Sequence, residues 1–186
     1  MTANNYGLAC GKTSCKLSFI CMIHTTQAIV LKKIPAGEAD AVVVLYTSDF
    51  GKIRAYAQGV KKESAKLKGH VEPLSLSAIQ FVIGAAGERL TYAQLLQSWP
   101  RTRDEFNRLS AAVYMMELVD RHCLVGQPDM SIWELLVTNL AMLNHESTRD
   151  ISHMTNEFEK DFLHALGYGN AKDMSVLGEP VQTYVH

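Results

Sequence analysis

The sequence predicts a β-barrel followed by a helical region. Five strand-like segments succeed one another between Thr25 and Trp99, and no helical period separates the first three. From Pro100 onward, apolar residues recur every three or four positions instead. Five short strands of this kind form a small, closed or nearly closed antiparallel barrel of the OB type. The predicted fold class is therefore β-barrel plus α: a five-stranded OB-fold over residues 22–99, then a three-helix domain over residues 100–169.

Turn residues bound the five strands. Pro35 and Gly37 separate the first two strands, Asp49 to Gly51 makes a tight connection to the third, and Gly84 to Gly87 forms a short loop before the fifth. The first two strands are rich in β-branched residues, as strands prefer. The predicted strands are Thr25 to Lys33, Asp40 to Ser48, Lys52 to Gln58, Leu74 to Ile83 and Glu88 to Trp99.

The fourth strand changes its apolar face part-way along. Leu74 and Leu76 lie on one face, whereas Ile79, Phe81 and Ile83 lie on the other. A one-residue slip of this kind is what a β-bulge produces, and small barrels need bulges to turn their corners. The pattern therefore predicts a bulge in this strand.

Three amphipathic helices follow Pro100. Capping-box spacing predicts that Thr102 with Glu105 begins the first helix and that Ser131 with Glu134 begins the second. The third helix is expected over residues 151–166, with Gly167 or Gly169 able to end it.

The stretch from Gly51 to Gly69 is the most basic in the chain, with six lysine or arginine residues against one acid, Glu63. Its first half alternates with period two, so that a strand presents one small apolar face and one polar face. The polar face carries Lys52, Arg54, Tyr56 and Gln58. Such a face can neutralise phosphates while the tyrosine ring stacks on an unpaired base.

An OB barrel commonly binds oligonucleotides on its second and third strands and on adjacent loops. Lysines at the end of the first strand fall beside that surface, and the lysine loop after the third strand extends it. A solvated edge strand with a flexible lysine loop is the alternative interpretation, because lysine also protects sheet edges from aggregation. The candidate nucleic-acid-binding residues are Lys32, Lys33, Lys52, Arg54, Tyr56, Lys61, Lys62, Lys66 and Lys68.

Charge is distributed unevenly along the chain, although the net charge is only −1. Residues 22–99 contain nine basic and six acidic residues, whereas residues 100–165 contain six basic and eleven acidic ones. The first half is therefore suited to meeting an anion, and the second half is not.

Several other functional classes find little support. A zinc knuckle is not indicated, because Cys10, Cys15 and Cys21 lack its two-residue spacing. A P-loop is not indicated by Gly11 to Ser14 either, because only three residues separate Gly7 from Gly11 where the motif needs four, and no strand precedes them. No catalytic motif, metal site or cofactor motif is evident, so an enzyme is not expected. Residues 1–21 are expected to be a poorly ordered leader, with Met22 as an alternative start, and neither a signal peptide nor a membrane span is expected. With no disulfide framework, a cytoplasmic location is expected.

Several spaced motifs of the sequence closely resemble the RecO family of bacterial DNA repair proteins. The matching motifs are Thr26 to Lys32, Gly37 to Asp40, Leu45 to Thr47, Phe50 to Ile53, Gly59 to Lys62, Ser64, Gly69, Pro73 to Leu74, Leu118 to Arg121 and Phe158 to Gly169. The resemblance implies a non-enzymatic, nucleoid-associated protein that binds single- and double-stranded DNA and anneals complementary strands. It also implies RecR and the single-stranded DNA-binding protein as partners, and assistance in loading the recombinase RecA.

The sequence departs from the family after Gly169. Family members usually continue for tens of residues, often with a four-cysteine zinc element, whereas seventeen residues without cysteine follow here. The chain therefore resembles a C-terminally short member with a tail at residues 170–186. The resemblance therefore assigns no zinc site to this chain. It also does not assign a pocket in the helical domain for the tail of the single-stranded DNA-binding protein. An OB-fold protein-interaction adaptor that does not touch nucleic acid is the alternative function.

Overall fold

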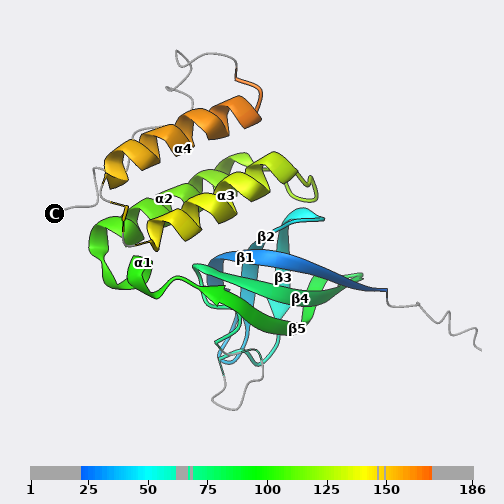
Figure 1. Ribbon diagram of the computed structural model, residues 1–186. Coiled ribbons are helices and arrows are strands. Elements are labelled where there is room, and N and C mark those ends of the chain that lie inside the picture. Colours follow the sequence, from blue (N-terminus) through cyan, green and yellow to red (C-terminus); the bar gives the residue numbers. More distant parts are fainter. Residues whose placement is uncertain (1–21, 62–66, 68, 146, 149, 169–186) are drawn as a thin grey trace, which may run out of the picture.

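The computed structural model describes residues 22–61, 67, 69–145, 147–148 and 150–168 (Figure 1). The expected leader at residues 1–21, the expected tail at residues 170–186, and Lys62, Lys66 and Lys68 lie outside the described residues.

Five strands close into a barrel in the order β1-β2-β3-β5-β4, which confirms the expected architecture (Figure 1). All neighbouring pairs are antiparallel except β3 and β5, which meet in a short parallel pairing. The strands are β1 (Ile23–Pro35), β2 (Ala41–Thr47), β3 (Gly51–Ala57), β4 (Ser75–Gly84) and β5 (Gly87–Ser98).

Small residues make the narrow interior of the barrel possible. Alternate residues of each strand point inward, and those on β3 are mostly alanine. A five-stranded barrel leaves little space along its axis, so small side chains must alternate with larger ones. The buried interior cluster comprises Ala28, Val30, Ala41, Val43, Leu45, Ile53, Ala55, Ala57, Val60, Val71, Ile79, Phe81, Leu90 and Ala93.

The helices cover one outer side of the barrel (Figure 1). They are α1 (Pro100–Asp104), α2 (Phe106–His122), α3 (Met130–Leu143) and α4 (Ile151–Ala165). In Figure 1, α2 and α3 lie between the barrel and α4. Outward-facing residues of the strands, among them Ile29, Val44 and Tyr46, join the same buried cluster as the helices. None of the described helices is both long and apolar enough to cross a membrane.

This packing explains the change of face in β4, and the predicted bulge in that strand is wrong. Leu74 and Leu76 belong to the cluster shared with the helices, whereas Ile79 and Phe81 belong to the barrel interior. The strand alternates regularly, but one end is buried on its outer face and the other on its inner face. The two register shifts between β4 and β5 each skip one residue of β5, Leu96 and Thr91, and no residue of β4.

The helix starts also differ from the predicted capping boxes. The first predicted helix is divided into α1 and α2, and Glu105 precedes α2 without a side-chain cap. Asp129 rather than Ser131 caps α3, because its carboxylate accepts hydrogen bonds from the backbone of Ser131 and Ile132. The end of α4 is as expected, since Gly167 follows it with a φ of 90°.

A close backbone approach joins β3 to the connection between α2 and α3. Gly51 has a φ of +64°, and a Cβ built there would lie 2.1 Å from the carbonyl oxygen of Gln127. One residue further on, the backbone N–H of Gly126 donates a 3.0 Å hydrogen bond to the carbonyl of Lys52. The hydroxyl of Tyr46 reaches the carbonyl of Asp129 at 3.4 Å. Backbone contacts therefore fix the helices against this end of β3.

Candidate nucleic-acid interface

The outer side of β3 and the start of β5 presents two exposed arginines. Tyr56 pairs with Arg89 across the short parallel contact, so both side chains point to the same side of the sheet. Arg54 lies two residues before Tyr56 and therefore shares this side. We call Arg54, Tyr56, Gln58 and Arg89 the arginine face; all four residues are exposed.

Arg54 and Arg89 differ in what they contact. The Arg89 Nη2 donates a 2.5 Å hydrogen bond to the Oε1 of Gln58, which orients its guanidinium across the face. Arg54 makes no hydrogen bond or ion pair with any residue that the structure describes. Its guanidinium therefore keeps its charge and all its donors for a ligand.

The Tyr56 ring is held at the surface by its hydroxyl. That hydroxyl donates to the Oδ2 of Asp40, and this hydrogen bond raises the pKa of Tyr56. The other carboxylate oxygen of Asp40 accepts a 2.6 Å hydrogen bond from the backbone N–H of Gly59. Tyr56 is 38% exposed, so part of its side chain faces solvent on the same side of the sheet as Arg54 and Arg89. A fixed, partly exposed ring is suited to stacking on a base.

Lys52 does not belong to this exposed surface, so the prediction that it is exposed is wrong. The residue is only 6% exposed, and its Nζ donates to the backbone carbonyl of Asp120 at 2.5 Å. The same Nζ lies 3.7 Å from the Oδ1 of Asp120. Alternation along β3 does place Lys52 outward, but the end of α2 covers that end of the strand. The carbonyls at a helix C-terminus and a carboxylate both favour a cation there.

Lys32 and Lys33 each meet an acidic side chain. The Lys32 Nζ lies 2.6 Å from the Oδ2 of Asp120, and the Lys33 Nζ lies 2.6 Å from the Oε1 of Glu72. The Lys32 side chain is 46% exposed, whereas that of Lys33 is mostly covered. A phosphate at either lysine would have to compete with a carboxylate.

Lys61 begins the lysine loop beside the arginine face. Its Nζ donates a 2.7 Å hydrogen bond to the carbonyl of Gly37, and its backbone N–H donates to the carbonyl of Ala39 at 2.9 Å. These contacts lie next to Asp40, which holds Tyr56. The structure thus brings Lys61 close to the Tyr56 end of the arginine face.

Arg89 is a candidate residue that sequence reasoning missed. Its position at the start of the fifth predicted strand could have indicated it, because a closed OB barrel places the start of that strand beside the third strand. Alternation with the inward-facing Leu90 then turns Arg89 outward. The long-range pairing, rather than the local pattern, brings this second arginine to Tyr56.

Comparison with known proteins gives two adjoining matches that together cover most of the chain. Residues 22–99 match the family model described as Recombination protein O N terminal, and residues 103–173 match the one described as Recombination protein O C terminal. The chain belongs to the RecO family. This confirms the resemblance drawn from the sequence motifs.

Individual RecO relatives are longer than this chain. It is 34% identical over 129 residues to the DNA repair protein RecO of Gloeothece citriformis, an alignment that covers 68% of this chain and 46% of the relative. It is 31% identical over 156 residues to the DNA repair protein RecO of Syntrophomonas wolfei, covering 84% of this chain and 62% of the relative. The chain therefore spans about half to three-fifths of the length of these relatives.

Two of the RecO-like motifs meet in space at the arginine face. The first runs from Gly37 to Asp40 before β2, and the second runs from Gly59 to Lys62 after β3. Asp40 contacts Gly59 and Tyr56, and Lys61 contacts the backbone of the first motif. The two motifs thus build one end of the candidate interface.

The arginine face contains no cysteine. Cys123 is buried, and burial raises the pKa of its thiol to about 11. Among the residues that the structure describes, no group of three histidine, cysteine or acidic side chains could hold a metal ion. Cys10, Cys15 and Cys21 lie outside the described residues.

Proposed function

We propose that this chain binds single- and double-stranded DNA without reading its sequence, and that it acts in DNA repair and recombination. The observation that carries the proposal is the arginine face, where Arg54 and Arg89 lie on the same side of the sheet as the partly exposed Tyr56. The names of its relatives, DNA repair protein RecO, support the same function. The proposed role requires no covalent chemistry by the protein, and it places the protein at the nucleoid in the cytoplasm.

Binding would rest on charge and stacking. Guanidinium groups neutralise phosphates and release condensed counterions, so the affinity should fall steeply with salt. Contacts to the backbone carry no sequence information, whereas Tyr56 could stack on any base of a single strand. The proposed contact set is the arginine face with Lys61, Lys62, Lys66 and Lys68, and Lys32 and Lys33 lie at its edge. We assign Lys52 to the joint between barrel and helices instead.

The same charges can promote annealing. Two complementary strands repel each other through their phosphates, and a protein surface that neutralises both lowers this repulsion. In the full proposal, the chain anneals strands and works with RecR to load RecA on DNA coated by the single-stranded DNA-binding protein. Strand annealing on such coated DNA, with and without RecR, tests this part. If the chain anneals bare DNA but not coated DNA, the proposed mediator role is excluded and the proposed DNA binding stands.

Replacing Lys61, Lys62, Lys66 and Lys68 together with alanine should weaken DNA binding and flatten its salt dependence. We expect the slope of log affinity against log salt to fall by about one unit for each phosphate contact that is lost. Fluorescence anisotropy with a labelled oligo-dT over a salt series measures this slope. The matching arginine variant keeps the charges and should retain the slope. An alanine variant with the original slope would exclude the lysine loop from the interface.

A further inference from the structure

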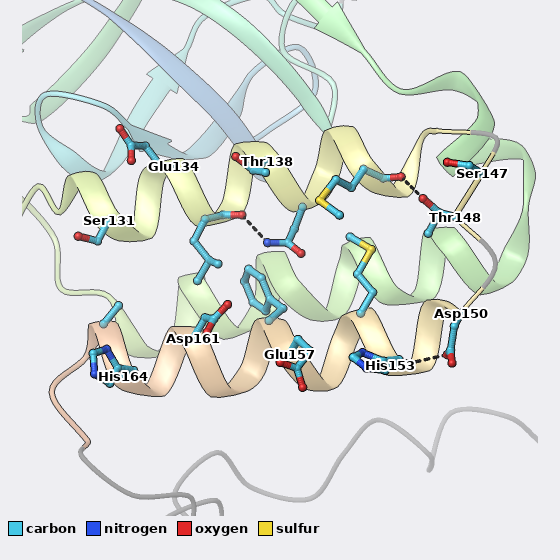
Figure 2. Close-up of a pocket in the computed structure, with 16 residues that line it drawn as sticks. Ser131, Glu134, Thr138, Ser147, Thr148, Asp150, His153, Glu157, Asp161 and His164 are labelled. Carbon is cyan, nitrogen blue, oxygen red and sulfur yellow. Dashed lines mark hydrogen bonds between the residues drawn. The ribbon is translucent and has the colours of Figure 1, made fainter.

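A groove with a volume of about 1040 Å³ lies between α3 and α4 (Figure 2). Side chains from both helices line it, together with residues of the connection between them. It lies on the helices, whereas the arginine face lies on β3 and β5. The proposed DNA interface therefore does not use this groove.

The rim of the groove is acidic. Glu134 lies on the α3 side, Glu157 and Asp161 lie on the α4 side, and Asp150 lies at the start of α4 (Figure 2). No lysine or arginine is among the described residues that line the groove. The neighbouring Lys160 pairs with Glu157 at 2.7 Å and offsets one of the four carboxylates. The rim would therefore repel a nucleic acid or an acidic peptide and attract a cationic ligand.

The floor of the groove is apolar. Leu135 and Met142 contribute from α3, and Met154 and Phe158 contribute from α4. Met142 is 50% exposed although it lies beside this apolar floor. Methionine side chains adapt their shape readily and are common on surfaces that bind helical partners. The floor thus offers apolar contact area inside a negatively charged rim.

We propose that the α3–α4 groove docks a cationic amphipathic helix of a partner protein. A helix lying along the groove would place apolar residues spaced three and four apart on the floor, as in other helix-in-groove complexes. Lysine or arginine residues on its flanks would then meet the carboxylates of both walls. The two groove helices have 14 and 15 residues, so a partner helix of about four turns would match their length.

The probe for this proposal is a labelled peptide of about four helical turns. Its leucines follow helical spacing on one face, and lysines fill the other positions. A second peptide carries glutamate in place of every lysine. Fluorescence anisotropy with the full chain should show that the lysine peptide binds at least tenfold more tightly than the glutamate peptide. Equal binding of the two peptides, or no binding of the lysine peptide, would overturn the proposal.

A pair of matched variants separates the groove from general charge attraction. Glu134→Gln with Asp161→Asn removes two groove carboxylates, and both residues are exposed, so folding should be retained. Glu38→Gln with Asp104→Asn removes the same charge from exposed positions outside the groove. We expect the groove variant to weaken binding of the lysine peptide by roughly fivefold, as for two partly exposed ion pairs, and the control to change it little. Equal weakening by both variants would overturn the proposal, whatever the outcome for DNA.

Discussion

Replacing Asp120 with alanine should lower the free energy of unfolding by about 2 to 4 kcal/mol. The change leaves the buried Lys52 ammonium with only a backbone carbonyl, and an unpaired buried charge is costly. The exposed Lys32 contributes less to this cost because solvent screens it. Urea unfolding followed by circular dichroism measures the effect.

A double-mutant cycle tests whether Asp120 acts through Lys52. Lys52→Met keeps the apolar stem and removes the charge, so it should cost less than Asp120→Ala. Once Lys52 is methionine, loss of Asp120 should cost much less than it does in the original chain. Strictly additive effects would show that the two residues do not stabilise the joint together. Because Lys52 is buried, its methionine variant should also bind DNA almost as the original chain does.

Replacing Gly51 with alanine should destabilise the fold by roughly 2 to 4 kcal/mol. A new Cβ would lie 2.1 Å from the Gln127 carbonyl oxygen and 2.8 Å from the Pro128 nitrogen, and both are backbone atoms that cannot rotate away. The φ of +64° adds strain for any residue with a Cβ. The barrel and the α2–α3 connection would have to separate to accept the methyl group.

Gly37 is the matched control for Gly51. Its φ is +89°, but a Cβ there would meet nothing within 4 Å. Gly37→Ala should therefore cost only the backbone strain, about 1 kcal/mol. Similar losses of unfolding free energy in the two variants would show that the close approach of Gly51 to Gln127 does not stabilise the contact between the barrel and the helices. Chemical unfolding of the two variants under one set of conditions makes the comparison.

The sequence predicted the strands well because local signals are strong there. Turn residues such as Pro35 and Gly37 bound the strands, and period-two alternation assigned Arg54 and Tyr56 to an outer face. The closed barrel was predicted from the number of short strands and the absence of a helical period between the first three. These features depend on neighbours in sequence, which a single chain displays directly.

The errors arose where distant segments meet. Alternation gives the direction of Lys52 but not its burial, which depends on where α2 ends against the barrel. The change of face in β4 has the same cause, because the helices bury the outer face at Leu76. At the start of α3, Asp129 and Ser131 could both act as caps, and the connection to the barrel places Asp129 at that position.

The candidate site was predicted only in part for the same reason. The sequence identified the basic third strand, but the pairing that brings Arg89 beside Tyr56 is a property of the closed barrel. The carboxylate partners of Lys32 and Lys33 also come from distant parts of the chain. Local charge therefore indicated which region could bind DNA. Tertiary contacts decide which of its cations are paired with a carboxylate.

The most direct test of the central proposal is the salt dependence of DNA binding by the Arg54→Ala, Arg89→Ala double variant. We expect the slope to fall by about two units and the affinity to fall roughly tenfold or more, equally for unrelated sequences. Arg121→Ala with Lys160→Ala removes two exposed cations from the helices and serves as the control. It should leave the slope unchanged. A double variant of the arginine face that binds oligo-dT with the original affinity and slope would contradict the proposal.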